Sequence, residues 1–324
     1  MRAVVVTSIN SAEAVLSQYL DRCQRCIVVG DDRSPTTYAI DVDFIDVDRQ
    51  LREFPELAGR LPRNHYSRKN IGYLHALRIG AQTISEIDDD VAPLANWGAI
   101  PDGMVATIIA PRWPNLLKSF TSGQCEIWAR GFPLDKVLQQ SHITYGESIA
   151  ASDVWIWQNW TSGAPDIDAV CRLTVNPLPE FIEHSPVALL GALAPFNSQN
   201  THWIKKEAMA FAYLPAFVTS RYTDILRSYI AQRVINAAGG FIGYAVCDTF
   251  SARNKHDFLD DLQQETEMYI ACRRVDETLN DVKWTGNRED LISAYEALAK
   301  NKLINNEEIT LASLWLDEFN KLVP

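Results

Sequence analysis

The sequence predicts an α/β protein with a doubly wound sheet, followed by a helical C-terminal segment. Over the first hundred residues, short runs of branched apolar residues alternate with segments of helical spacing, which is typical of β-α-β units. From about residue 256 onward, apolar residues recur at helical spacing among charged ones. The segment from about residue 91 to 220 is irregular and rich in Pro and Trp, so we expect short strands and loops there.

Four short strands are expected in the N-terminal part. Each is an apolar run bounded by polar or turn residues, as in strands buried on both faces. The expected strands are Ala3–Thr7, Cys26–Val29, Asp43–Val47 and Gln82–Ile87. In doubly wound sheets ligands bind beyond the carboxyl ends of the strands, so the acidic residues that follow the second and fourth strands are candidate ligand contacts.

Helices are expected between the strands and throughout the C-terminal part. Ser11 is a plausible N-cap for the first helix, and Gly80 is a natural stop for the second. The expected helices are Ser11–Arg22, Ser67–Gly80, Tyr222–Ala238, Asp257–Arg273, Arg288–Asn301 and Glu307–Leu322. We therefore expect one domain over residues 1–270 and a helical extension over residues 271–324.

The charge balance excludes several classes of partner. A formal net charge of −11 argues against binding to nucleic acid or to an anionic membrane surface, because both require a basic surface. We expect no integral membrane segment, since no apolar run approaches the ~20 residues that a membrane span needs. The N-terminus does not have the pattern of a signal peptide. A cytoplasmic protein is the expectation, with peripheral membrane contact left open.

The acidic triplet Asp88–Asp90 directly follows the fourth expected strand. Residues two apart at a strand end point the same way, so Asp88 and Asp90 can converge. Two carboxylates that close repel each other unless a cation lies between them, and hard divalent cations such as Mg²⁺ or Mn²⁺ suit oxygen ligands. Such a cation can bridge a diphosphate. The alternative is a solvated acidic loop.

Four further residues are candidate nucleotide contacts. Thr7 and Asp31 stand at the ends of the first two strands, where a carboxylate can accept hydrogen bonds from base or ribose groups. Arg68 and Lys69 stand near the start of a helix, an arrangement that favours anions, and can contact phosphate or ribose. We expect Asp89 to face away from the cation or to contact the ribose. The competing interpretations are a capping turn and a solvated basic turn.

Asp224 lies in the first turn of the helix expected at Tyr222–Ala238. A carboxylate there is stabilised by the helix dipole, which is the structural interpretation. The catalytic interpretation makes Asp224 the general base that deprotonates an acceptor hydroxyl.

Several long segments resemble the glycosyltransferase-like domain of the STELLO family. They occur in the family order over roughly residues 1–270. The segments are RKNIGYLHALRIGAQTISEIDDD, RGFPLD (130–135), DIDAVCRLT (166–174), APFNSQNTHW (194–203) and LPAFVTSRYTDILRSYIAQR (214–233). Compared with the plant members, which carry a membrane anchor, this chain looks like a short, soluble relative.

The resemblance implies a GT-A fold, a Rossmann-like mixed sheet flanked by helices. It implies that Asp88 and Asp90 form the DxD metal motif for Mn²⁺ or Mg²⁺ and that His256 is a late metal ligand. Asp224 corresponds to the acid of the family's xED site, although Thr223 stands where a second acid is common. The donor would be a nucleotide sugar, and the acceptor a hydroxyl of a polysaccharide, glycolipid or other glycan.

Three more residues are tentative contacts for the sugar or the acceptor. Asp166 and Asp168 form a second acidic pair, which can equally be a turn that enters a strand. Trp157 can stack on a sugar face, although large aromatic residues are more often part of a core or interface.

The sequence therefore predicts a metal-dependent glycosyltransferase. Two alternatives stay open: a nucleotidyltransferase or phosphoryl-transfer enzyme with the same carboxylate–metal site, and a catalytically inactive scaffold. The absence of a P-loop motif weakens the first alternative. The helical extension is suited either to covering the acceptor cleft or to forming a homodimer interface.

Overall fold

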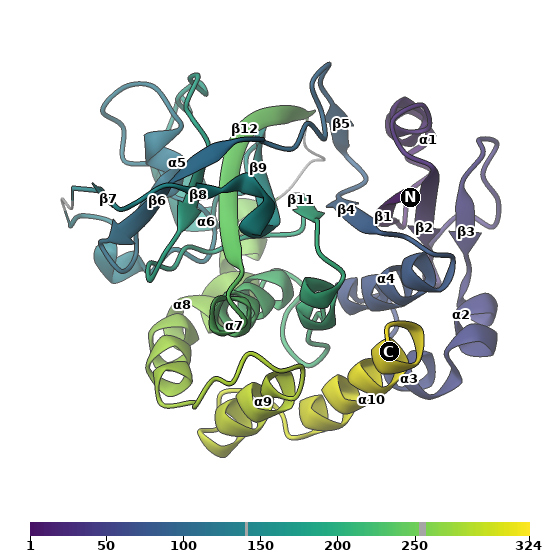
Figure 1. Ribbon diagram of the computed structural model, residues 1–324. Coiled ribbons are helices and arrows are strands. Elements are labelled where there is room, and N and C mark those ends of the chain that lie inside the picture. The colour runs from purple at the N-terminus through teal and green to yellow at the C-terminus, as the bar shows by residue number, and fades with distance from the viewer. Residues whose placement is uncertain (140–141, 253–256) are drawn as a thin grey trace.

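The computed structural model describes residues 1–139, 142–252 and 257–324, which form one mixed sheet with helices packed mainly on one face (Figure 1). In the described part of the chain, the main strand order is β3-β2-β1-β4-β11-β9-β12-β10-β6-β7. The predicted α/β class is confirmed, and the sheet is mixed, as the family resemblance implied.

The N-terminal half of the sheet is parallel. Strand β1 lies between β2 and β4, and β3 forms the outer edge next to β2. The strands are β1 (Arg2–Thr7), β2 (Arg25–Val29), β3 (Asp43–Ile45) and β4 (Thr83–Ile87). All four agree with the expected strands to within two residues at each end. Strands β1, β2 and β4 are mostly buried, whereas the edge strand β3 is only partly buried.

The other half of the sheet is reached through β11, which runs antiparallel to β4 and to β9. Strands β9 and β12 are the longest, and they pair in parallel with several register shifts. The strands of this half are β5 (Val91–Pro93), β6 (Met104–Ala110), β7 (Thr144–Tyr145), β8 (Ile149–Ala150), β9 (Val154–Gly163), β10 (Val187–Leu189), β11 (Asn200–Trp203) and β12 (Phe241–Ser251). The sequence analysis did not predict β9 and β12; in β9 the buried polar residues Gln158, Asn159 and Thr161 hide the strand pattern.

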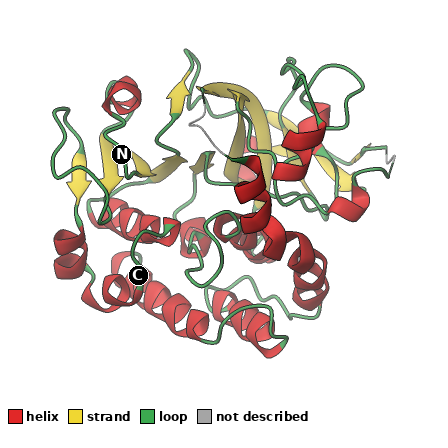
Figure 2. Ribbon diagram, turned by 180° about the vertical axis from the view of Figure 1, so that it is seen from behind, coloured by secondary structure: helices red, strands yellow, loops and turns green. Residues whose placement is uncertain are grey.

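Most helices cover the same face of the sheet, and Figure 2 shows this layer from behind. Helix α4 packs on β1 and β2, α7 packs near β12, and α10 lies against α3 and α4. The helices are α1 (Glu13–Leu16), α2 (Val47–Glu53), α3 (Pro55–Arg60), α4 (Lys69–Arg78), α5 (Leu116–Ser119), α6 (Ala169–Thr174), α7 (Thr223–Ala237), α8 (Phe258–Asn280), α9 (Asp290–Lys300) and α10 (Glu307–Leu322). No helix within the described ranges is long and apolar enough to cross a membrane.

The starts of the first two expected helices differ from the structure, and the helix expected to end at Arg273 continues to Asn280. The helix expected at Ser11–Arg22 is broken into α1 and a 3₁₀ turn, and Ala12 rather than Ser11 precedes α1, with a positive φ of 45°. The helix expected from Ser67 begins as the 3₁₀ turn Tyr66–Arg68, and the side chain of His65, not that of Ser67, accepts a hydrogen bond there.

The C-terminal helices pack closely against the rest of the fold. The boundary expected after residue 270 falls inside α8, so the structure has no break at that point. The buried carboxylate of Glu308 in α10 accepts hydrogen bonds from the backbone N–H groups of Ala216 and Phe217 and from the Tyr213 hydroxyl. The helical extension therefore holds the loop that leads into α7.

Candidate functional site

A cavity of about 370 Å³ opens at one edge of the sheet. The carboxyl ends of β1, β2, β4, β9 and β12 meet there, together with the segment that precedes the reversed strand β11. Among the predicted site residues, those that line it are Thr7, Asp31, Arg68, Asp88, Asp89, Asp90, Asp166 and Asp224. Residues from six separate segments of the chain are therefore brought together, as expected for this edge of an α/β sheet.

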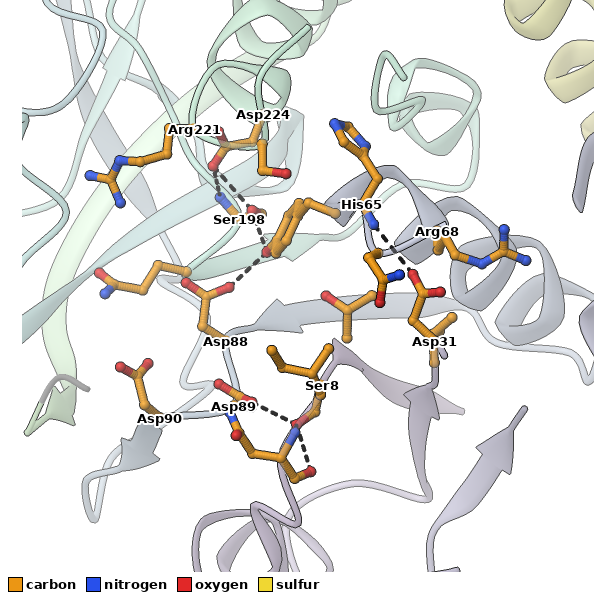
Figure 3. Close-up of a pocket in the computed structure, with 18 of the residues that line it drawn as sticks. Ser8, Asp31, His65, Arg68, Asp88, Asp89, Asp90, Ser198, Arg221 and Asp224 are labelled. Carbon is orange, nitrogen blue, oxygen red and sulfur yellow. Dashed lines mark hydrogen bonds between the residues drawn. The ribbon is translucent and has the colours of Figure 1, made fainter. Parts of the chain in front are cut away.

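The side chains of the acidic triplet point in different directions (Figure 3). Asp89 turns toward β1, where it accepts hydrogen bonds from Ser8 Oγ at 2.6 Å and from Asn10 Nδ2 at 3.1 Å. Asp88 accepts a hydrogen bond from the Tyr66 hydroxyl at 2.7 Å. Asp90 lies near Asp88, and its negative charge acts on Asp88.

The surroundings of Asp88 favour a cation. The pKa of Asp88 is raised to about 7: burial raises it most, Lys69 opposes this, and the nearby charge of Asp90 raises it as well. No group of three or more His, Cys, Asp or Glu side chains within the described ranges is arranged to hold a metal ion. Mg²⁺ is commonly held by one or two protein carboxylates plus substrate phosphates and water, so the pair Asp88 and Asp90 fits such an ion. His256, the predicted third ligand, lies outside the described residues.

The nucleotide-side candidates at the strand ends lie in the cavity wall. Asp31 Oδ2 accepts a hydrogen bond from the backbone N–H of His65 at 3.3 Å, which ties the end of β2 to the turn before α4. Thr7 lies at the end of β1, paired with Val29.

The two basic candidates are buried and already bonded. Arg68 donates from Nε to Gln50 Oε1 at 2.8 Å and from a terminal nitrogen to Leu61 O at 3.1 Å, and it points away from Asp88 (Figure 3). Lys69 does not line the cavity, and its Nζ donates to the Tyr66 hydroxyl and to Ile87 O at 2.7 and 2.8 Å. Both side chains support the local structure; Arg68 also lines the cavity, whereas Lys69 does not, and a direct phosphate contact of either residue stays a prediction.

Asp224 is held by a buried arginine. Arg130 donates from its two terminal nitrogens to Asp224 Oδ1 and Oδ2, each at 2.9 Å. Ser198 donates to Oδ2 from its backbone nitrogen and its hydroxyl, each at 3.1 Å. Although burial opposes ionisation, Arg130 lowers the pKa of Asp224 to about 2. A carboxylate with this pKa is a weak proton acceptor at neutral pH, so the geometry disfavours the predicted general-base role.

Of the three residues predicted as tentative sugar or acceptor contacts, only one lines the cavity. Asp166 lines the cavity and accepts two hydrogen bonds from Arg130 at 2.8 Å. Asp168 is buried, caps α6 and accepts from Trp128 Nε1 at 2.6 Å. Trp157 is buried in a separate apolar cluster with Val154 and other residues, so no face of its ring is open to a sugar. Asp168 and Trp157 therefore have structural surroundings, and of the three Asp166 lies at the site.

Three residues of this site were missed by the sequence analysis: Tyr66, Arg130 and Ser198. Each occurs in a segment quoted for the family resemblance, or beside one, which is the signal that could have found them. Their roles depend on partners far along the chain; Arg130 and Asp224, for example, are 94 residues apart.

Comparison with known proteins connects the chain to one family. The family model of the STELLO glycosyltransferases matches residues 221–323. Probable glycosyltransferase STELLO1 of Arabidopsis thaliana is 24% identical over 319 residues, which is 90% of this chain and 40% of that protein. Probable glycosyltransferase STELLO2 of the same plant is 26% identical over 301 residues, 85% of this chain and 38% of that protein. The chain thus spans about two fifths of the length of these relatives.

Solved structures show weaker similarity. Glucosyl-3-phosphoglycerate synthase from Mycobacterium tuberculosis, crystallised with Mn²⁺, UDP-glucose and phosphoglyceric acid, is 14% identical with a TM-score of 0.40, covering 84% of this chain and 79% of that one. A mannosyltransferase from Pyrobaculum calidifontis, in complex with GDP-Man and Mn²⁺, is 11% identical with a TM-score of 0.39, covering 99% and 84%. The chain is therefore similar in sequence to the STELLO glycosyltransferases, through the family model over residues 221–323 and through the two Arabidopsis proteins over most of its length.

Proposed function

We propose that the chain is a metal-dependent glycosyltransferase that moves a sugar from a nucleotide-sugar donor to a hydroxyl acceptor. The observation that carries this proposal is the cavity at the sheet edge, in which Asp88 and Asp90 lie close together where β4 ends. The names of the two Arabidopsis relatives, both probable glycosyltransferases, support it.

On the donor side, Asp88 and Asp90 would hold Mn²⁺ or Mg²⁺, with His256 as the proposed third ligand. When bound, such a cation offsets the negative charge that develops on a departing diphosphate. The wall formed by Thr7, Asp31 and Asp89 offers carboxylate and hydroxyl oxygens to the ribose and base of the donor.

On the acceptor side, Arg130 lies between two carboxylates and forms ion pairs with both Asp166 and Asp224. The three side chains together carry one net negative charge. Because Arg130 keeps Asp224 ionised, we assign Asp224 a fixed negative charge beside the reacting sugar rather than the task of removing a proton. Such a charge stabilises positive charge that develops at an anomeric carbon.

Calorimetric titration with a panel of nucleotide sugars tests the proposal directly. We expect at least one to bind in the presence of Mn²⁺ and to bind much more weakly in EDTA. Asp88→Asn and Asp90→Asn should each abolish the metal-dependent part of the binding, because each removes a charged oxygen ligand.

Asp102→Asn is the matched control, because Asp102 is exposed in a loop and does not line the cavity. It should bind as the wild type does. Failure of every nucleotide sugar to bind, with or without Mn²⁺, would refute the proposal. Release of pyrophosphate from a nucleoside triphosphate would favour the nucleotidyltransferase instead.

A further inference from the structure

Two hydroxyl groups meet in the wall of the cavity between its two carboxylate clusters. Tyr66 lies in the 3₁₀ turn before α4, and Ser198 lies in the segment before β11. Their oxygens are 2.7 Å apart, although the residues are separated by 132 positions in the sequence.

Each hydroxyl also reaches one of the carboxylates. The Tyr66 hydroxyl is 2.7 Å from Asp88 Oδ1, and Ser198 Oγ is 3.1 Å from Asp224 Oδ2. Figure 3 shows Ser198 between Asp224 and Asp88. The four side chains form a continuous row of polar contacts, which we call the hydroxyl bridge, from the end of β4 to the start of α7. Because the Tyr66 proton goes to Asp88, Ser198 donates its one hydroxyl proton either to Tyr66 or to Asp224, and its backbone N–H bonds Asp224 in both cases.

A buried ammonium group fixes the centre of the hydroxyl bridge. Lys69 Nζ donates to the Tyr66 hydroxyl at 2.7 Å and to the backbone oxygens of Ile87 and Ser198 at 2.8 and 3.3 Å. The Lys69 side chain is fully buried, so these bonds are not exchanged for bonds to bulk water. Lys69 thus connects the end of β4 at Ile87 with the segment before β11 at Ser198.

The Asp224 end is fixed as well. Arg130 and the backbone nitrogen of Ser198 hold both Asp224 oxygens, as described above. The Asp88 end is the adjustable one, because about a third of its side chain is exposed in the cavity. A hydrogen bond from Tyr66 therefore selects one orientation of a carboxylate that could otherwise rotate.

We propose that Tyr66 and Ser198 are positioning residues, which hold Asp88 at a fixed place relative to Asp224. This inference rests on the proposed function, in which Asp88 binds the cation and Asp224 lies beside the reacting sugar. Hydrogen bonds that orient metal ligands typically contribute 10–100-fold to metal affinity. The hydroxyl bridge thereby connects metal binding on the donor side with the geometry of the acceptor side.

The test is a double-mutant cycle read by Mn²⁺ titration calorimetry, with KM and kcat measured alongside. Tyr66→Phe keeps the ring and removes the hydroxyl, and we expect it to weaken Mn²⁺ binding by about 10–100-fold. Ser198→Ala should weaken it by a smaller factor, because Lys69 still holds Tyr66. The double variant should bind within about twofold of Tyr66→Phe, since residues in one network are not additive.

Tyr244→Phe is the matched control. The Tyr244 hydroxyl is buried and bonds the backbone oxygen of Ala194, and Tyr244 does not line the cavity. Its loss should leave the Mn²⁺ dissociation constant unchanged. Wild-type Mn²⁺ affinity in Tyr66→Phe, or factors that simply multiply in the double variant, would overturn the positioning role while leaving the proposed function intact. A wild-type protein that binds neither Mn²⁺ nor any nucleotide sugar would overturn both.

Discussion

Arg130 is the residue whose removal should disturb the site most. Its guanidinium group bonds Asp166 at 2.8 Å and Asp224 at 2.9 Å. The exposed fractions of the side chains are 8% for Arg130, 12% for Asp166 and 4% for Asp224. The charges of the two carboxylates are therefore neutralised by Arg130 rather than by water.

Arg130→Met keeps most of the length of the side chain and removes its charge. Breaking a buried ion pair by removing one partner typically costs about 3–5 kcal/mol, because the other charge is left uncompensated. Two carboxylates lose their partner here. We therefore expect the free energy of unfolding at pH 8 to fall by at least about 3 kcal/mol.

The size of this loss should depend on pH. In the wild type, Arg130 lowers the pKa of Asp224 to about 2, so its stabilising contribution is present above the ordinary aspartate pKa and is lost only as the pH falls toward 2. In the variant, burial without Arg130 raises the pKa of Asp224 above its ordinary value. Its charged form then destabilises the fold, and protonation relieves this as the pH falls. The difference between variant and wild type should therefore be smaller at pH 5 than at pH 8.

Urea unfolding followed by tryptophan fluorescence at both pH values measures this difference. Arg112→Met is a matched control, because Arg112 pairs with Asp276 but is 46% exposed, and exposed pairs contribute about 0–1 kcal/mol. A loss below about 1 kcal/mol for Arg130→Met at pH 8, or a loss that grows on acidification, would refute the reasoning.

Three other predictions concern the metal, the helical extension and the core. The pKa of Asp88 is raised to about 7, and metal binding requires the ionised carboxylate. Mn²⁺ should therefore bind about tenfold more tightly at pH 8 than at pH 6. Equal affinity at both pH values, measured by calorimetry, would count against Asp88 as a ligand. Glu308→Ala should lower the free energy of unfolding by about 2 kcal/mol or more, since it leaves the buried N–H of Ala216 and the partly buried N–H of Phe217 without their acceptor. Urea unfolding checks this, and an unchanged midpoint would contradict it. Gly72→Ala should cost about 1–3 kcal/mol, because its Cβ would lie 2.6 Å from methyl carbons of Val5 and Val29, and an unchanged melting temperature would show that α4 can shift outward.

The sequence was sufficient for the features that depend on local pattern. Strands β1, β2 and β4 are short apolar runs, and Asp88 follows the last of them directly, so its place at the sheet edge could be predicted. Helices α7 and α10 also agree with their expected bounds to within one residue, because their ends carry clear changes of composition.

Features that depend on distant partners could not be predicted in this way. The sequence predicts Lys69 as a phosphate or ribose contact at a helix start, but α4 lies between the sheet and α10 and is buried on nearly all sides. Trp157 reads as a candidate sugar contact, but the strands around β9 enclose it. In both cases, burial is decided by elements far away in the sequence.

The reversed direction of β11 has a consequence for the chemistry of this sheet edge. The parallel strands β1, β2 and β4 end at this edge, whereas β11 starts there. Because β11 begins there instead, the segment before it presents amide hydrogens, and Ser198 uses one to bind Asp224. One inverted strand therefore lets the backbone itself act as a counter-charge, so that an edge crowded with acidic side chains can persist in a protein that is already strongly anionic.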